Sequence, residues 1–246
     1  MTRTGMIALG LIGLILAGWE GAVKIWAVPV FILPPPSRIL ETAVVQAPQI
    51  LPHAAVTGAE ICLGIFLALV TAIPLAVAMF AKPMVEKALS PFLVASQAIP
   101  VFALAPLLVI WLGYGMASKV FMAWIIIFFP ITVSLLQGLK SCDPEYRTLF
   151  TLMGASFFKT LTLLYWPWAL PQFFAGLRVG VSVATIGAVI GEWVGAQQGL
   201  GFLMIQSNAR LQTPLVFAAI LWLAAMGLIL WTLVGLLEKK IITWKS

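Results

Sequence analysis

The chain has 246 residues, of which 62% are hydrophobic and only 9% charged, and its mean hydropathy is +1.10. Soluble domains carry about 25% charged residues, so this composition excludes a soluble protein and indicates an integral membrane protein. The net charge of +6 does not indicate a nucleic-acid partner, because the basic residues lie between the apolar runs. The length suits one helical bundle, so we expect residues 1–246 to form a single transmembrane domain.

Six apolar runs predict the membrane-spanning segments. Each is close to the ~20 residues that cross the hydrocarbon core as a helix. The runs are continuous rather than alternating, which excludes a barrel and predicts an all-α membrane protein with about six transmembrane helices. The runs are Met6–Val23, Ala54–Phe80, Pro91–Leu112, Val120–Leu139, Gln172–Val194 and Leu215–Leu237. A cleaved signal peptide is the alternative interpretation of the first run, but its basic region is thin and its removal would leave five spans.

The distribution of basic residues predicts the orientation. Cytoplasmic loops of membrane proteins carry an excess of Lys and Arg. Six spans place both termini on one side, and nine basic residues lie in the segments of that side: Arg3, Lys82, Lys87, Lys140, Arg147, Lys159, Lys239, Lys240 and Lys245. The opposite segments hold four: Lys24, Arg38, Lys119 and Arg210. Both termini and the loop at about residues 140–171 are therefore predicted to be cytoplasmic.

This cytoplasmic loop carries the most informative local pattern. Asp143 suits the cap of a helix, Pro144 its first position, and Glu145 the positive end of its dipole. A break at Gly154 predicts two short helices. The first presents one apolar face at helical spacing, made of Tyr146, Leu149, Phe150 and Met153. An apolar face on the wet side of a membrane protein favours docking into a groove of a partner.

The segments on the opposite side also have structure. Phe31–Ser37 contains three consecutive prolines and predicts an extended link. Ser37 is then expected to cap a short helix at Arg38–Gln46. Between the fifth and sixth spans, Phe202–Leu211 is amphipathic and too short to cross the membrane, so we expect it either to lie on the surface or to re-enter the membrane.

Several motifs along the chain occur in an order and spacing typical of one family. The motifs are Leu33–Leu40, Ile99-Pro100, Ala105-Pro106-Leu107, Trp111-Leu112-Gly113, Asp143-Pro144, Gly154-Ala155-Ser156, Leu170-Pro171 and Gly176-Leu177-Arg178. With them, nearly the whole chain resembles the permease subunits of ATP-binding-cassette (ABC) importers, in the branch that handles nitrate, sulfonates, taurine and pyrimidine precursors.

The resemblance implies a type I importer permease of the bacterial inner membrane, present as two identical copies. Its partners would be an ATPase subunit and a soluble or lipid-anchored substrate-binding protein. The residues implied in ATPase docking are Glu145, Tyr146, Leu149, Phe150, Met153, Gly154, Ala155 and Ser156. One departure is that the Glu-Ala-Ala of the family falls on Thr148, Leu149 and Phe150, so an acidic contact is missing and Glu145 is its nearest substitute.

The motifs in the C-terminal part of the chain favour one group of substrates. Gly191–Gly195, Gly199-Leu200-Gly201, Ala209-Arg210 and Thr213 most resemble permeases for thiamin pyrimidine precursors of the hydroxymethylpyrimidine type and for riboflavin. Sulfonate, taurine or nitrate is the alternative.

Five polar or helix-breaking residues inside the spans are candidates for the translocation path. Carboxylates in the membrane by default face a water-filled path or a partner, which selects Glu60 and Glu192. Ser96 and Gln97 precede Pro100, whose ring can expose backbone carbonyls. The alternatives are a helix cap or headgroup position for Glu192, an interhelical hydrogen bond for Glu60, and simple packing for Ser96 and Gln97.

The chain carries no signature of catalysis. It has a single histidine, His53, and no phosphate-binding loop, so we expect no enzyme activity, metal or cofactor, and ATP hydrolysis must occur on a partner. An ion-coupled secondary transporter is the alternative class, but no internal repeat supports it. A membrane-embedded assembly factor would not explain the docking loop.

Overall fold

The computed structural model describes residues 3–244, in which every regular element is a helix. The chain divides into two compact units. One comprises Met1–Val56 and Gln197–Ala224, and the other comprises Thr57–Ala196 and Ala225–Ser246.

The first unit is built from short helices and the beginnings of two long ones. It contains α1 (Arg3–Ile25), α2 (Pro36–Val45), the start of α3 (Ala47–Ala81), α10 (Leu200–Ala209) and the start of α11 (Thr213–Ile241). The expected cap of α2 by Ser37 is wrong. The helix begins at Pro36, and both the backbone N–H and the hydroxyl of Ser37 donate to the carboxylate of Glu20, at 3.0 and 2.8 Å.

Contacts within this unit fix α10 and the link that precedes α2. The N–H of Gly199 donates to Nδ1 of His53 at 3.1 Å, and the ring of His53 lies 6.1 Å from that of Phe202. The hydroxyl of Thr213 donates to the carbonyl of Phe31 at 2.5 Å. The single histidine therefore has a structural role at the start of α10, a helix that begins two residues earlier than predicted.

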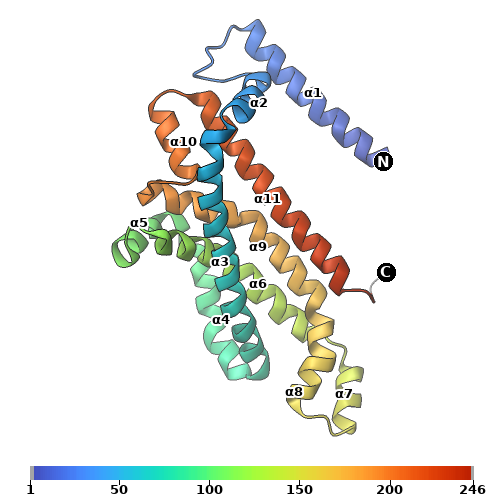
Figure 1. Ribbon diagram of the computed structural model, residues 1–246. Helices are drawn as coiled ribbons and strands as arrows, with labels where there is room; N and C mark the ends of the chain where they lie inside the picture. The colour runs from blue at the N-terminus through green and yellow to red at the C-terminus, as the bar shows by residue number, and fades with distance from the viewer. Residues whose placement is uncertain (1–2, 245–246) are drawn as a thin grey trace. The chain divides into compact units, whose positions relative to one another are not determined.

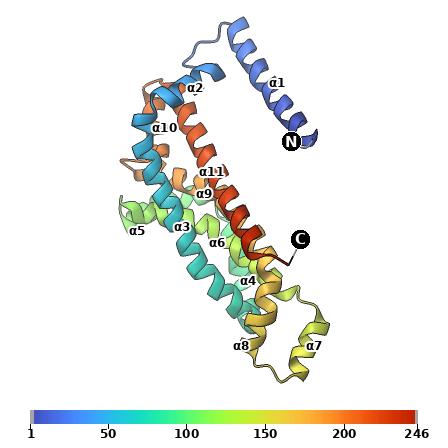
Figure 2. The same cartoon turned by 45° about the vertical axis from the view of Figure 1, so that its right-hand side comes forward.

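The second unit contains the remaining helices. They are the rest of α3 and α11, α4 (Pro83–Ala98), α5 (Val101–Leu112), α6 (Met116–Lys140), α7 (Pro144–Leu152), α8 (Phe157–Thr160), a π-helix (Leu161–Tyr165) and α9 (Trp166–Gly195). Figures 1 and 2 show α7 and α8 together at one end of α9.

Four of the six predicted spans are confirmed: within residues 3–244, the segments Ala47–Ala81, Met116–Lys140, Phe157–Gly195 and Thr213–Ile241 are long and apolar enough to cross a membrane. The first predicted span lies in α1, a 23-residue helix that is not among these four. The predicted straight span Pro91–Leu112 is wrong, because α4 and α5 meet at a bend of 100° and count as a fifth span only if taken as one broken segment. Ile99 is extended between them and Pro100 caps α5. The cause is local: proline has no N–H, and it disfavours helical dihedrals in the residue before it.

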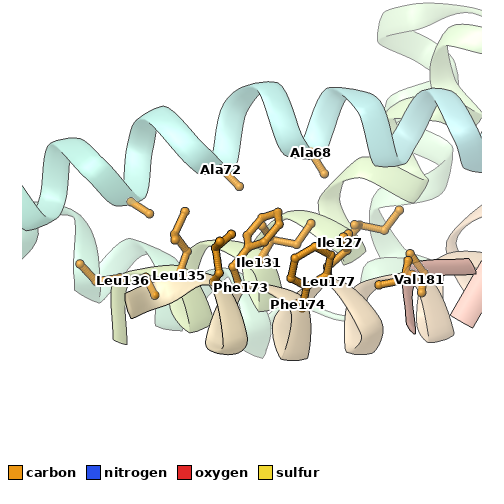
Figure 3. Close-up of a cluster of buried hydrophobic side chains, with 14 of the residues drawn as sticks. Ala68, Ala72, Ile127, Ile131, Leu135, Leu136, Phe173, Phe174, Leu177 and Val181 are labelled. Carbon is orange, nitrogen blue, oxygen red and sulfur yellow. The ribbon is translucent and has the colours of Figure 1, made fainter. Parts of the chain in front are cut away.

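The core of the second unit lies where α3, α6 and α9 meet. Figure 3 shows Ala68 and Ala72 of α3 pointing toward the larger side chains of the other two helices. Those side chains are fully or nearly fully buried and include Ile127, Ile131, Leu135, Phe173, Phe174, Leu177 and Val181. Small residues on one helix thus accommodate large residues on its neighbours, as close packing requires.

Two glycines of α9 set how closely it approaches α6. A Cβ added at Gly176 would lie 2.5 Å from Cβ of Ser134 and 2.6 Å from the carbonyl oxygen of Pro130. A Cβ added at Gly187 would lie 2.8 Å from Cα of Ala123. Membrane helices associate through such small residues because lipid provides no hydrophobic driving force between them.

We expect Gly176→Ala to destabilise the protein, because its methyl group would overlap backbone and Cβ atoms of α6. Overpacking of this kind typically costs about 1–3 kcal/mol. The measurement is the thermal unfolding of the purified protein in detergent. Gly13→Ala in α1 is the matched control, since an added Cβ there meets nothing within 4 Å. Equal melting temperatures for the two variants would contradict the close contact.

Candidate functional site

The start of the docking loop is confirmed as predicted. Asp143 caps α7 by accepting a hydrogen bond from the N–H of Glu145 at 2.8 Å, and Pro144 occupies the first helical position. Glu145 lies exposed in the first turn. The capping residue satisfies one of the free donors of the helix, so this short helix has a defined beginning.

Gly154 ends α7 in a left-handed conformation, with φ of +68°. The N–H of Gly154 donates to the carbonyl of Thr151 and that of Ala155 to the carbonyl of Phe150, both at 3.0 Å. This pair of bonds is a Schellman motif, in which glycine is favoured because it has no Cβ. Ser156 then accepts from the N–H of Lys159 and caps α8. The predicted break at Gly154 is thus confirmed, but the second short helix is not separate, because α8 continues through the π-helix into α9 as one segment, Phe157–Gly195.

The apolar face of α7 is exposed. Tyr146 and Leu149 are about half exposed and Met153 is 74% exposed, whereas Phe150 is partly covered. Leu152, the last residue of α7, is 80% exposed, although the predicted pattern did not include it. The signal for Leu152 was its place three residues after Leu149, which puts the two side chains near each other on a helix.

Two side chains attach α7 to the rest of the second unit. Arg147 donates to the carbonyl of Lys140 at the end of α6, at 2.7 Å, and its guanidinium lies 5.5 Å from the ring centre of Tyr165. The ring of Tyr146 lies 5.7 Å from that of Trp168. Movement of α7 would therefore be transmitted to α6 and to the start of α9. Sequence reasoning missed Arg147, because nothing in its local spacing reveals partners on two other helices.

The predicted path residues fall into two groups. Ser96, Gln97 and Pro100 are exposed around the break between α4 and α5. Ser96 donates to the carbonyl of Leu93 at 2.7 Å, and the side-chain amide of Gln97 lies 3.4 Å from the hydroxyl of Ser96. These residues form local contacts and remain available to line a path.

The second group is a buried cluster that joins α3, α6 and α9. Glu60 and Glu192 are 3% and 1% exposed. They lie within interaction range of each other and of Lys119. The hydroxyl of Thr57 donates to Oε1 of Glu192 at 2.6 Å. The structure therefore brings the two predicted carboxylates together and adds Thr57 and Lys119, which the prediction did not include.

Lys119 was expected in a segment between two spans, but it lies inside α6 and is only 2% exposed. The side chain of Glu192 is equally buried. Spacing along the chain did not reveal this cluster, because its members lie on different helices.

Ion pairs tie other helices of this unit together. Arg178 of α9 contacts Glu238 of α11 at 2.6 Å and lies 5.0 Å above the ring of Trp231. Lys140 at the end of α6 pairs with Glu86 of α4. Among residues 3–244, no three His, Cys, Asp or Glu side chains are placed to hold a metal ion.

Several helices that can cross a membrane, a buried polar cluster and a short helix with an exposed apolar face describe a multi-pass membrane protein. Comparison with known proteins specifies the class. The model of the binding-protein-dependent transport system inner membrane component family matches residues 60–243. The chain belongs to this family.

Similar proteins carry related names. A probable ABC transporter permease of Haemophilus influenzae is 42% identical over 221 residues, 90% of each chain. A formylaminopyrimidine transport permease of Halalkalibacterium halodurans is 39% identical over 229 residues, 93% of this chain and 91% of the relative. The taurine transport permease of Escherichia coli is 30% identical over 251 residues, 99% of this chain and 91% of the relative.

The chain is therefore a permease subunit of an ABC importer and is not itself an enzyme. Its family implies an ATPase and a substrate-binding protein as partners. The resemblance drawn from the motifs of the sequence is confirmed.

We expect Glu192→Gln to reduce uptake several-fold and Glu192→Ala to reduce it further. The amide keeps an acceptor for Thr57, whereas alanine removes it, and losing a buried hydrogen-bond partner costs about 1–3 kcal/mol. Uptake would be measured in vesicles that contain the ATPase and the binding protein. If the two variants were equally damaging, the charge of Glu192 rather than its hydrogen bonding would be the essential property.

Proposed function

We propose that this permease forms the translocation path for a small heteroaromatic solute, most consistent with a thiamin pyrimidine precursor. The relative from Halalkalibacterium halodurans is named for formylaminopyrimidine transport and matches more than nine-tenths of this chain. A riboflavin permease of Chloroflexus aurantiacus is 42% identical over 161 residues, 65% of this chain and 60% of the relative. The motifs in the C-terminal part of the sequence favour the same substrates.

Taurine or another sulfonate is the second candidate. The taurine permease aligns over nearly the whole chain but at 30% identity, and an aliphatic sulfonate permease of Bacillus subtilis is 25% identical. The observation that separates the candidates is the ligand of the partner binding protein. Calorimetric titration of that protein with formylaminopyrimidine, riboflavin and taurine tests the proposal, and tight binding of taurine alone would overturn it.

The observation that supports energy coupling is the exposed apolar surface of α7, which Arg147 attaches to the end of α6 and to Tyr165 of the π-helix before α9. In the proposed complex, a groove of the ATPase covers Tyr146, Leu149, Leu152 and Met153. ATP binding would close a pair of ATPase subunits and draw the docking helices of two permease copies together. Arg147 would carry this displacement into the membrane helices.

We also propose how the permease is placed in the membrane. The permease would lie in the bacterial inner membrane with both termini and α7 on the cytoplasmic side, and a soluble or lipid-anchored binding protein would deliver the solute from outside. Two identical copies in the lipid bilayer would surround one path, lined by Ser96, Gln97 and Pro100 and closed near Glu60 and Glu192.

We predict that Gly154→Pro abolishes uptake and co-purification of the ATPase while membrane insertion persists. Proline holds φ near about −65°, which is incompatible with the left-handed backbone, and it lacks the N–H that bonds Thr151. Gly154→Asn is the matched control, since asparagine tolerates this conformation, and it should retain most uptake. Normal uptake by the proline variant would rule out a docking role for this turn.

Cysteine labelling tests the orientation. In a background lacking Cys62 and Cys142, a thiol placed by Ser156→Cys should react with an impermeant reagent only from the cytoplasmic face. One placed by Gln198→Cys should react only from the opposite face. Both native side chains are exposed, so accessibility alone does not limit the reaction. Reversed sidedness would contradict the proposed topology and the access of an ATPase to α7.

A further inference from the structure

Four buried polar side chains meet at the end of α9 that lies away from α7. Thr57 and Glu60 come from α3, Lys119 from the first turns of α6, and Glu192 from the last turn of α9, and none is more than 3% exposed. Besides the bond from Thr57 to Glu192, the carboxyl groups of Glu60 and Glu192 lie within hydrogen-bonding range of each other. A hydrogen bond between two carboxyl groups requires a proton on one of them.

Lys119 occupies the third corner of this cluster. Its Nζ donates to the carbonyl oxygens of Tyr114 at 2.6 Å and of Gly195 at 2.8 Å. Gly195 ends α9, so the ammonium also faces the negative end of that helix. A Cβ added at Gly191 would lie 3.1 Å from Cα of Lys119, which shows how closely the two helices approach here.

The charges of the cluster do not balance if all three groups are ionised. Two carboxylates and one ammonium leave one uncompensated negative charge, and an isolated charge in the membrane or in a protein core is strongly unfavourable. The charged groups that act on Glu60 are Glu192 and Lys119. One bound proton makes the cluster neutral.

We propose that Glu60 and Glu192 hold one proton between them and, together with Lys119, form a neutral latch that ties α3, α6 and α9 at this end of the bundle. The latch would keep the end of the translocation path closed while leaving no net charge in the membrane. This role in closing the path rests on the proposed function, whereas the shared proton does not.

The hydrogen bonds place the proton on Glu60. Glu192 accepts from Thr57, as an ionised carboxylate does most favourably. Oε2 of Glu60 is buried and accepts no hydrogen bond. A buried oxygen without a donor is much less costly on a neutral carboxyl group than on a carboxylate. Glu60 is therefore the proton carrier, and its neutral isostere is glutamine.

Infrared spectroscopy of the purified permease at neutral pH tests the shared proton without any partner protein. The spectrum should contain the band of a protonated carboxyl group. Glu60→Gln should remove it, and Glu192→Gln should remove it as well, because Glu60 would then ionise opposite Lys119. The exposed Glu41 is the control, and Glu41→Gln should leave the band unchanged. A band that is absent from the native protein, or that survives Glu60→Gln, would overturn the proposal.

A charge-balance series tests the latch. Lys119→Met leaves the carboxyl pair without its cation and should lower both the melting temperature and the uptake, the latter by about tenfold or more. Lys119→Met with Glu192→Gln is neutral again and should recover most of the melting temperature and part of the uptake. Lys119→Met with Glu41→Gln should recover neither.

The two readouts separate the two parts of the inference. Recovery of the melting temperature without recovery of uptake would retain the neutral cluster and overturn its role in transport. Failure of the double variant to recover the melting temperature would overturn the neutral cluster itself. If Lys119→Met does not fold, the infrared series on Glu60 and Glu192 still decides the proton.

Discussion

The structure depends on the close approach of helix backbones. In a lipid bilayer, the hydrophobic effect does not drive one helix against another. Lipid tails are as apolar as the side chains that face them, so helices associate through dense packing and interhelical polar contacts. Gly176 and Gly187 permit α9 to approach the backbone of α6, and the alanines of α3 admit the large side chains of both helices. Gly64 of α3 approaches Ala123 in the same way.

The polar contacts of the second unit follow from this packing. Once α6 and α9 are in contact, Lys119 reaches the carbonyl of Gly195 at one end, and Arg147 bridges the end of α6 and Tyr165 at the other. The pair of helices therefore carries the buried polar cluster at one end and α7 at the other. In the proposed function, this pair would connect the ATPase to the path inside the membrane.

Much of the local structure could be predicted because its causes are local. The cap at Asp143, the glycine that ends α7 and the apolar runs of the spans each follow from the properties of a few neighbouring residues. Two predictions of local structure were wrong. Pro100 bends a span that was predicted to be straight, and Ser37 bonds Glu20 instead of capping α2.

By itself, the sequence determined that this is an all-helical membrane protein, where α7 begins and ends, and which family the chain resembles, since composition, periodicity and motif order are properties of the linear chain. Only the tertiary structure decided that Lys119 is buried, that Glu60 and Glu192 share one cluster with it, and that Arg147 anchors α7. These pairings join residues from different helices, up to 135 positions apart for Thr57 and Glu192. Such partners are chosen by helix packing, and helical periodicity says which face a residue occupies but not which helix that face will meet.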